Sequence, residues 1–159
     1  MSKHKLEEYR KNVFTCARCG VCVHKYNEKV RKVCPSWEHS PGFETYNARG
    51  KMMIARGILE GRFDYSPKIT EALTYCTTCG NCVTQCGMTD TTTGEFMMVT
   101  PEIVEAMRTD AVDLGLIPVA HKHLGMRIEK TRNSYGEPKE NRMKWSEGLN
   151  VSFAEAEKR

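Results

Sequence analysis

Eight cysteines fall into two groups of four, and none is left over. Each group opens with three cysteines at every third position. Such a triplet can turn its thiolates toward one face of an iron–sulfur cluster and hold three irons. The fourth iron of a 4Fe-4S cluster then needs a thiolate from further along the chain. The sequence therefore predicts two 4Fe-4S clusters. The groups are Cys16, Cys19, Cys22 and Cys34, then Cys76, Cys79, Cys82 and Cys86.

The fourth cysteine of each group is expected to bind the cluster of the other group, as it does in two-cluster ferredoxins. Cluster one would be held by Cys16, Cys19, Cys22 and Cys86. Cluster two would be held by Cys76, Cys79, Cys82 and Cys34. Such crossed ligation would join the two halves of the chain in one core.

Two zinc sites of four cysteines each are the alternative use of these thiols. Zinc favours two Cys-x2-Cys pairs separated by a longer loop, and a triplet in one tight loop suits it less well. Gly20 and Gly80 each follow the second cysteine of a triplet, where the backbone must pass close to a cluster. Cluster ligation is therefore the favoured interpretation, and a zinc-binding interaction module remains the alternative from a different class.

Length and composition exclude several other classes of protein. The chain has 159 residues, 40% of them hydrophobic, and its mean hydropathy is −0.54, as in globular proteins. It holds no 18-residue apolar stretch and no apolar signal segment, so we expect neither a membrane span nor secretion. We expect a cytoplasmic location, where thiols bind metals rather than form disulfides. No nucleotide fingerprint and no nucleophile–base pair is found, so we expect no catalytic residues.

Charge is unevenly distributed along the chain. Residues 1–32 carry nine Lys or Arg against three Asp or Glu, residues 33–116 six against eleven, and residues 117–159 nine against six. The ends are thus basic and the middle acidic, although the net charge is only +4. Two clusters with thiolate ligands would contribute roughly −4 and leave the protein near neutral. We therefore expect docking surfaces for protein partners and no binding of nucleic acid.

The elements that must position the cysteines are helices, because no period-2 alternation indicates a strand. Apolar spacing and capping residues predict helices over residues 2–14, 51–60, 66–75, 100–114, 118–128 and 139–147. We predict an all-α fold in which two cysteine-loop half-domains surround the clusters. Residues 1–132 would form this domain, and residues 133–159 a helical C-terminal linker and docking segment.

The chain resembles the α-helical ferredoxin module of the heterodisulfide reductase C subunit and of the iron–sulfur N-terminal part of D-type relatives. The resemblance rests on the two cysteine triplets, on the segment Tyr46-Asn47-Ala48-Arg49-Gly50-Lys51, and on Asn133-Ser134-Tyr135-Gly136-Glu137-Pro138 with Arg142 and Trp145. Two features depart from the family, whose motifs close with Cys-x3-Cys-Pro. Cys34 follows Cys22 after a gap of eleven residues instead of three, so it could instead be a free buried thiol, and Cys86 is followed by Gly87.

The resemblance implies an electron-transfer subunit that is not itself catalytic and that works in a hetero-oligomer. A flavin- or iron–sulfur-containing subunit would donate electrons, and a separate CCG-domain catalytic subunit would accept them. The same module serves anaerobic glycerol-3-phosphate, lactate or glycolate, and succinate or fumarate oxidoreductases, which are alternatives. A redox or iron sensor is a third possibility, but no effector element is visible.

Two further expectations concern single residues. Arg18 places a positive charge beside cluster one, which should give that cluster the higher reduction potential. The C-terminal aromatic and aliphatic residues either anchor a partner or pack on their own domain. These residues are Tyr135, Trp145, Leu149 and Phe153.

Overall fold

The computed structural model describes residues 4–24 and 33–149. It divides the chain into two compact units, Met1–Pro118 and Val119–Arg159. All eight cysteines belong to the first unit. The boundary predicted between residues 132 and 133 lies inside the second unit.

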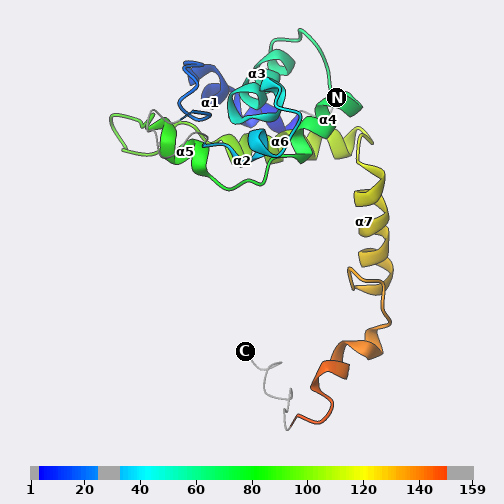
Figure 1. Ribbon diagram of the computed structural model, residues 1–159. Coiled ribbons are helices and arrows are strands. Elements are labelled where there is room, and N and C mark those ends of the chain that lie inside the picture. Colours follow the sequence, from blue (N-terminus) through cyan, green and yellow to red (C-terminus); the bar gives the residue numbers. More distant parts are fainter. Residues whose placement is uncertain (1–3, 25–32, 150–159) are drawn as a thin grey trace. The chain divides into compact units, whose positions relative to one another are not determined.

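The first unit is built from helices joined by loops (Figure 1), so the predicted all-α class is confirmed. The described residues form no strand. Their one β-bridge pairs Thr89 with Phe96, in the loop between Cys86 and Thr100. The 3₁₀ helices are η1 (Lys5–Tyr9) and η2 (Glu44–Tyr46). The α-helices are α1 (Arg10–Thr15), α2 (Pro35–Glu38), α3 (Ala48–Leu59), α4 (Pro67–Thr74), α5 (Asn81–Cys86) and α6 (Thr100–Asp113).

Side-chain caps and prolines decide where the longer helices begin. The Asn47 carboxamide accepts a hydrogen bond from the Gly50 N–H at 2.8 Å, and α3 starts between them. The Ser66 hydroxyl accepts from the Ile69 N–H at 3.3 Å, and α4 starts with a proline at the position predicted. The first helical residue of α3 is Ala48, three residues before the predicted start, because the polar Asn47 takes the capping position.

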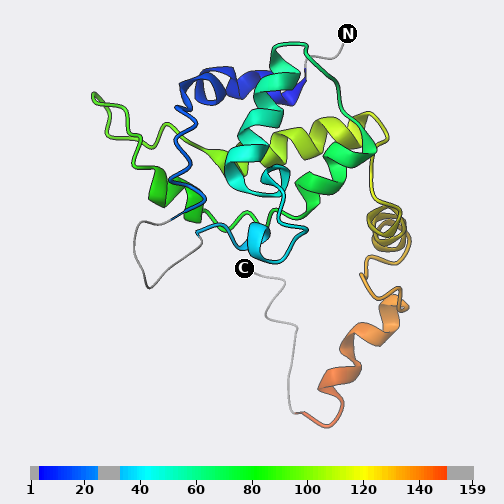
Figure 2. The ribbon, with the colours of Figure 1, turned by 45° about the horizontal axis from the view of Figure 1, so that its top comes forward.

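The core forms where α3, α4, α6 and η1 pack together, and Figure 2 shows α3 crossing α6. Apolar residues at helical spacing supply it, as predicted for α4 and α6. Its fully buried side chains are Leu6, Val13, Ala55, Leu73, Ile103, Val104 and Met107. The cysteine loops lie beside this core, since Cys16, Cys76 and Cys86 are half-buried against it.

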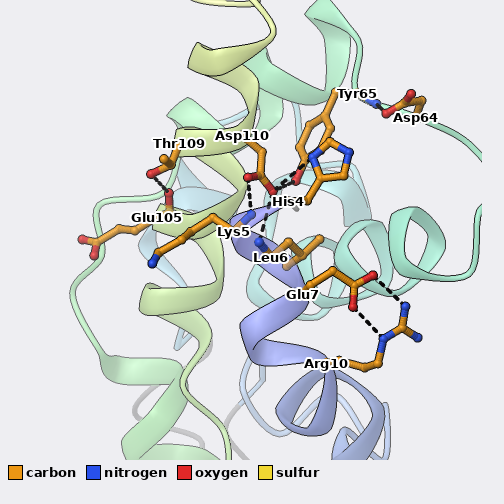
Figure 3. A network of polar contacts seen from close by, with 10 residues as sticks. All are labelled: His4, Lys5, Leu6, Glu7, Arg10, Asp64, Tyr65, Glu105, Thr109 and Asp110. Carbon is orange, nitrogen blue, oxygen red and sulfur yellow. Dashed lines mark hydrogen bonds and ion pairs between the residues drawn. The ribbon is translucent and has the colours of Figure 1, made fainter. Parts of the chain in front are cut away.

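A buried carboxylate on α6 fixes the N-terminal segment (Figure 3). Asp110 accepts hydrogen bonds from the backbone N–H groups of Lys5 at 2.6 Å and Leu6 at 3.1 Å. The Tyr65 hydroxyl donates to the same carboxylate at 2.8 Å. The Lys5 and Leu6 N–H groups lie at the start of η1, where they have no partner within the helix, and the negative charge of Asp110 satisfies them. Leu6 is thereby held in the core.

The second unit contains α7 (Val119–Thr131) and η3 (Lys139–Ser146). Both were predicted, but the last one is a 3₁₀ helix rather than an α-helix. Neither helix buries a residue, and Tyr135 and Trp145 are 85% and 64% exposed. The prediction for Phe153 lies outside the described residues. No helix in the described ranges is long and apolar enough to cross a membrane.

Candidate iron–sulfur site

The two cysteine triplets adopt the same backbone conformation. In the first loop Arg18 and Gly20 have φ of 60° and 85°, and in the second loop Thr78 and Gly80 have φ of 50° and 77°. The left-handed region is costly for residues with a side chain, and most costly for a β-branched one such as Thr78. Matching left-handed residues on both sides of the middle cysteine make each triplet curl around a shared interior. The two triplets are therefore a repeat at the level of the backbone.

A tight turn begins at the glycine inside each triplet and includes the third cysteine. The Gly20 carbonyl accepts from the N–H groups of Val23 at 2.8 Å and His24 at 3.1 Å, and the Gly80 carbonyl accepts from Val83 at 2.9 Å and Thr84 at 3.2 Å. After Gly80 the turn continues as α5, which carries Cys82 and Cys86 four residues apart and hence on one face. This helix was not predicted, because the sequence around it reads as a cysteine loop.

The first pocket is lined by the first triplet. Cys86 completes this lining, so the structure brings together the four residues predicted for cluster one. Cys82, Met52, Met98 and Thr100 supply much of the remaining wall. Arg18 and Arg49 also line the pocket, at its basic side. A thiol from the second half of the chain is thus brought to the first loop.

The second pocket is lined by the second triplet together with Cys34. The four residues predicted for cluster two therefore share one pocket. Two contacts bring Cys34 there. The N–H of Val33 donates to the Val23 carbonyl at 2.9 Å, and the Val33 carbonyl accepts from Asn81 on α5 at 3.5 Å. The chain thus returns past the first loop and meets the second.

Cys82 and Thr100 line both pockets, which makes the two sites neighbours. Burial, with smaller contributions from the nearby Cys82 and Cys16 thiols, raises the pKa of Cys22 to about 12. Burial likewise raises the pKa of Cys82 to about 11, although a hydrogen bond with Thr100 acts in the opposite direction. Such thiols ionise when a cation binds them, so these two residues are suited to metal ligation and not to free thiolate chemistry.

Two cations on α3 were missed by the sequence analysis, although both lie in the segment that carries the resemblance. Arg49 lines the first pocket and forms an ion pair with Glu44. Lys51 lines the second pocket, is only 1% exposed, and donates a hydrogen bond to the Tyr46 carbonyl. A signal existed in the sequence. Lys51 stands among apolar residues of the helix, directly before Met52, where a solvated lysine is not expected.

Two side chains fasten the cysteine loops to the helical core. Arg108 on α6 donates hydrogen bonds to the carbonyls of Leu73 at 2.7 Å and Cys76 at 2.5 Å, and so fixes the start of the second loop. Asn12 on α1 donates to the Met97 carbonyl at 2.7 Å, which holds the loop between Cys86 and α6 against the first half of the chain.

The cysteines line pocket walls and do not converge on a point. Among the described residues, no group of three or more His, Cys, Asp or Glu side chains is placed to hold a single metal ion. A cubane cluster has different needs from zinc, because each thiolate binds a separate iron and the cluster itself fills the space between the sulfurs. Two neighbouring pockets, each lined by at least four cysteines, fit that requirement.

Comparison with known proteins agrees with this geometry. Residues 12–89 match the family of the 4Fe-4S dicluster domain, and this stretch includes all eight cysteines. No curated protein and no solved structure matches the chain. The family match concerns the cysteine module alone. Residues 12–89 are therefore an iron–sulfur, ferredoxin-like module of the 4Fe-4S type.

Proposed function

We propose that this protein is an electron-transfer subunit that carries two 4Fe-4S clusters. It passes electrons from a flavin- or iron–sulfur-containing donor subunit to a separate CCG-domain catalytic subunit of a heterodisulfide reductase-like complex. The observation that carries the proposal is the pair of neighbouring pockets, each lined by one cysteine triplet together with the fourth cysteine of the other group, with Cys82 lining both. A 4Fe-4S cluster supplies one-electron transfer when it is bound.

The chain's own residues would hold the clusters in the following way. Cys16, Cys19, Cys22 and Cys86 ligate cluster one in the first pocket. Cys76, Cys79, Cys82 and Cys34 ligate cluster two in the second pocket. Cys34 is buried and lines the second pocket, which supports its role as a ligand over that of a free thiol.

The arrangement suits a relay for two reasons. Cys82 lines both pockets, so an electron would cross from one cluster to the other over a single wall of side chains. The middle cysteine of each triplet, Cys19 or Cys79, is solvent-exposed. Each cluster would therefore have an edge near the surface where a partner protein docks. Such contacts use complementary charge to orient the partner, and the acidic middle and basic ends provide it.

The heterodisulfide reductase assignment rests on the resemblance alone. The exposed side chains of the second unit, Tyr135 and Trp145, support its use as an anchor for the catalytic subunit. Deleting residues 133–159 should leave cluster content unchanged and abolish binding to a purified CCG-domain subunit. Binding that survives the deletion would show that the partner docks elsewhere.

The electron-transfer proposal is tested by one anaerobic preparation of the full chain. Iron and acid-labile sulfide analysis should give about eight of each per chain, as two 4Fe-4S clusters require. The reduced protein should show the EPR spectrum of two magnetically interacting clusters. A colourless protein with two zinc ions and no iron would refute the proposal in favour of an interaction module.

A further inference from the structure

Lys51 is the most deeply buried charged side chain described in the protein. Its exposed fraction is 1%, and it lines the second pocket together with all four of the cysteines there. Burying an ammonium costs several kcal/mol unless an opposite charge or good hydrogen bonds compensate. Replacing a buried lysine that lacks such compensation by an apolar residue would cost little stability. The groups that compensate the charge of Lys51 therefore indicate its role.

The compensation found within the protein is small. Lys51 donates one hydrogen bond, to the Tyr46 carbonyl. In residues 4–24 and 33–149, no carboxylate lies within ion-pair distance of its Nζ atom. The groups that interact with it electrostatically are Cys76, Cys34 and Cys82, which favour its charge, and Arg108, which opposes it. Burial lowers the pKa of Lys51, and the three cysteines act against that shift.

A cluster in the second pocket would supply the missing anion. Four thiolates around a 4Fe-4S core carry a net charge of about −2 when oxidised, and reduction adds one more negative charge. A cation beside the cluster favours the more negative state. Because Lys51 is shielded from water, its effect is screened less than that of a surface charge.

We propose that Lys51 is the counter-charge of cluster two and raises the reduction potential of that cluster. The inference rests on the proposed function, since it requires a cluster in the second pocket. The charge of Lys51 acts on the cluster through space. Reduction transfers one electron from the reductant to the cluster, and no covalent bond to Lys51 forms or breaks.

The first pocket offers a weaker counter-charge. Arg49 is 33% exposed and already forms an ion pair with Glu44, and Arg18 is exposed to solvent. Part of the Arg49 charge is therefore neutralised before a cluster binds. Cluster two, and not cluster one, should have the higher potential on this account. This reverses the order that the sequence analysis inferred from Arg18 alone.

The test uses full-length protein with both clusters and compares Lys51→Met, Lys51→Gln and Lys51→Arg by EPR-monitored redox titration. Loss of the charge in the Met and Gln variants should lower the reduced-to-oxidised ratio of one cluster at least tenfold at fixed potential, a shift of 59 mV for one electron. The Arg variant should keep at least half of the wild-type effect. The matched variant Arg49→Gln should shift the other cluster.

Two results would overturn the proposal. One is an unchanged potential in both Lys51→Met and Lys51→Gln. The other is loss of the second cluster from all three variants, because Lys51 would then serve only to hold the Tyr46 carbonyl. Loss from the Met and Gln variants with retention in the Arg variant supports the charge role. Wild-type protein without iron would instead refute the proposed function itself.

Discussion

The two cysteine loops have one backbone conformation but obtain their fourth cysteine in different ways. Both are left-handed at matching positions, Arg18 with Gly20 and Thr78 with Gly80. The second loop continues into α5, which places Cys86 one helical turn after Cys82. The first loop is followed by a turn, and its group ends twelve positions later with Cys34, at the start of α2. The repeat thus keeps the conformation of the triplet and not the route by which the fourth cysteine arrives.

This difference shows how the two halves of the chain are joined. The first pocket takes Cys86 from the second half and the second pocket takes Cys34 from the first half, while Cys82 lines both, so neither pocket is lined by one half alone. A helix suffices for Cys86, because the two pockets adjoin at Cys82 and one turn of α5 moves from one pocket to the other. Cys34 needs a longer path, which ends between the first loop and α5.

Double replacement of cysteines should have the largest effect, because it tests which cysteines share a cluster. If the ligation is crossed, Cys19→Ala and Cys86→Ala damage the same cluster, and the double variant should retain about four iron per chain. Cys79→Ala combined with Cys86→Ala should damage both clusters and retain close to none. Iron analysis and the EPR spectrum of the reduced protein measure the outcome.

Uncrossed ligation predicts the opposite assignment for the same variants. The Cys79 and Cys86 pair would then lose one cluster, and the Cys19 and Cys86 pair would lose both. Replacing Cys34 by Ala provides the matched control. It should share its cluster with Cys79, and its double variant with Cys79 should keep about four iron per chain.

Replacement of Arg108 should weaken the second loop selectively. Arg108→Met removes two hydrogen bonds from a guanidinium to the Leu73 and Cys76 carbonyls, at a cost of about 2–4 kcal/mol. Cluster two should then be lost to a chelator several-fold faster than cluster one, as followed by EPR.

A neighbour on the same helix serves as the control for Arg108. Asp110→Asn removes a carboxylate acceptor of the η1 N–H groups and of the Tyr65 hydroxyl, so it should destabilise the whole unit by a similar amount. It touches neither cysteine loop, and the two clusters should be lost at unchanged relative rates. Equal losses in the Arg108 variant would mean that this arginine supports the fold as a whole.

The sequence was sufficient for the helical class, for α4 and α6, and for the cysteine groups, because these depend on local spacing. The grouping of cysteines around two pockets could be proposed from the triplet pattern alone. The routes of Cys34 and Cys86 could not, since they depend on contacts such as Val33 with Val23. Lys51 was missed because a lysine is ordinarily assigned to the surface, and only packing reveals that this one lies beside cysteines.

The glycines of the two loops should differ in their tolerance of alanine. Both have positive φ, where an added Cβ costs about 1–2 kcal/mol. A Cβ on Gly20 would also lie 2.8 Å from an Arg49 guanidinium nitrogen, whereas one on Gly80 would meet nothing within 4 Å. Thermal unfolding should show Gly20→Ala as the less stable variant. Equal midpoints would mean that Arg49 moves aside freely.

The smallest expected effect belongs to Arg18, the residue that matches Thr78 in the second loop. Arg18 lines the first pocket but is exposed, so water and salt screen its charge. Arg18→Gln should lower the potential of cluster one by roughly 40 mV at most, the one-electron equivalent of a charge pair in water. The shift should shrink further between low and high salt, whereas the Lys51 shift should persist because that charge is buried. A large, salt-insensitive shift for Arg18 would show that this side chain folds over the bound cluster and excludes water.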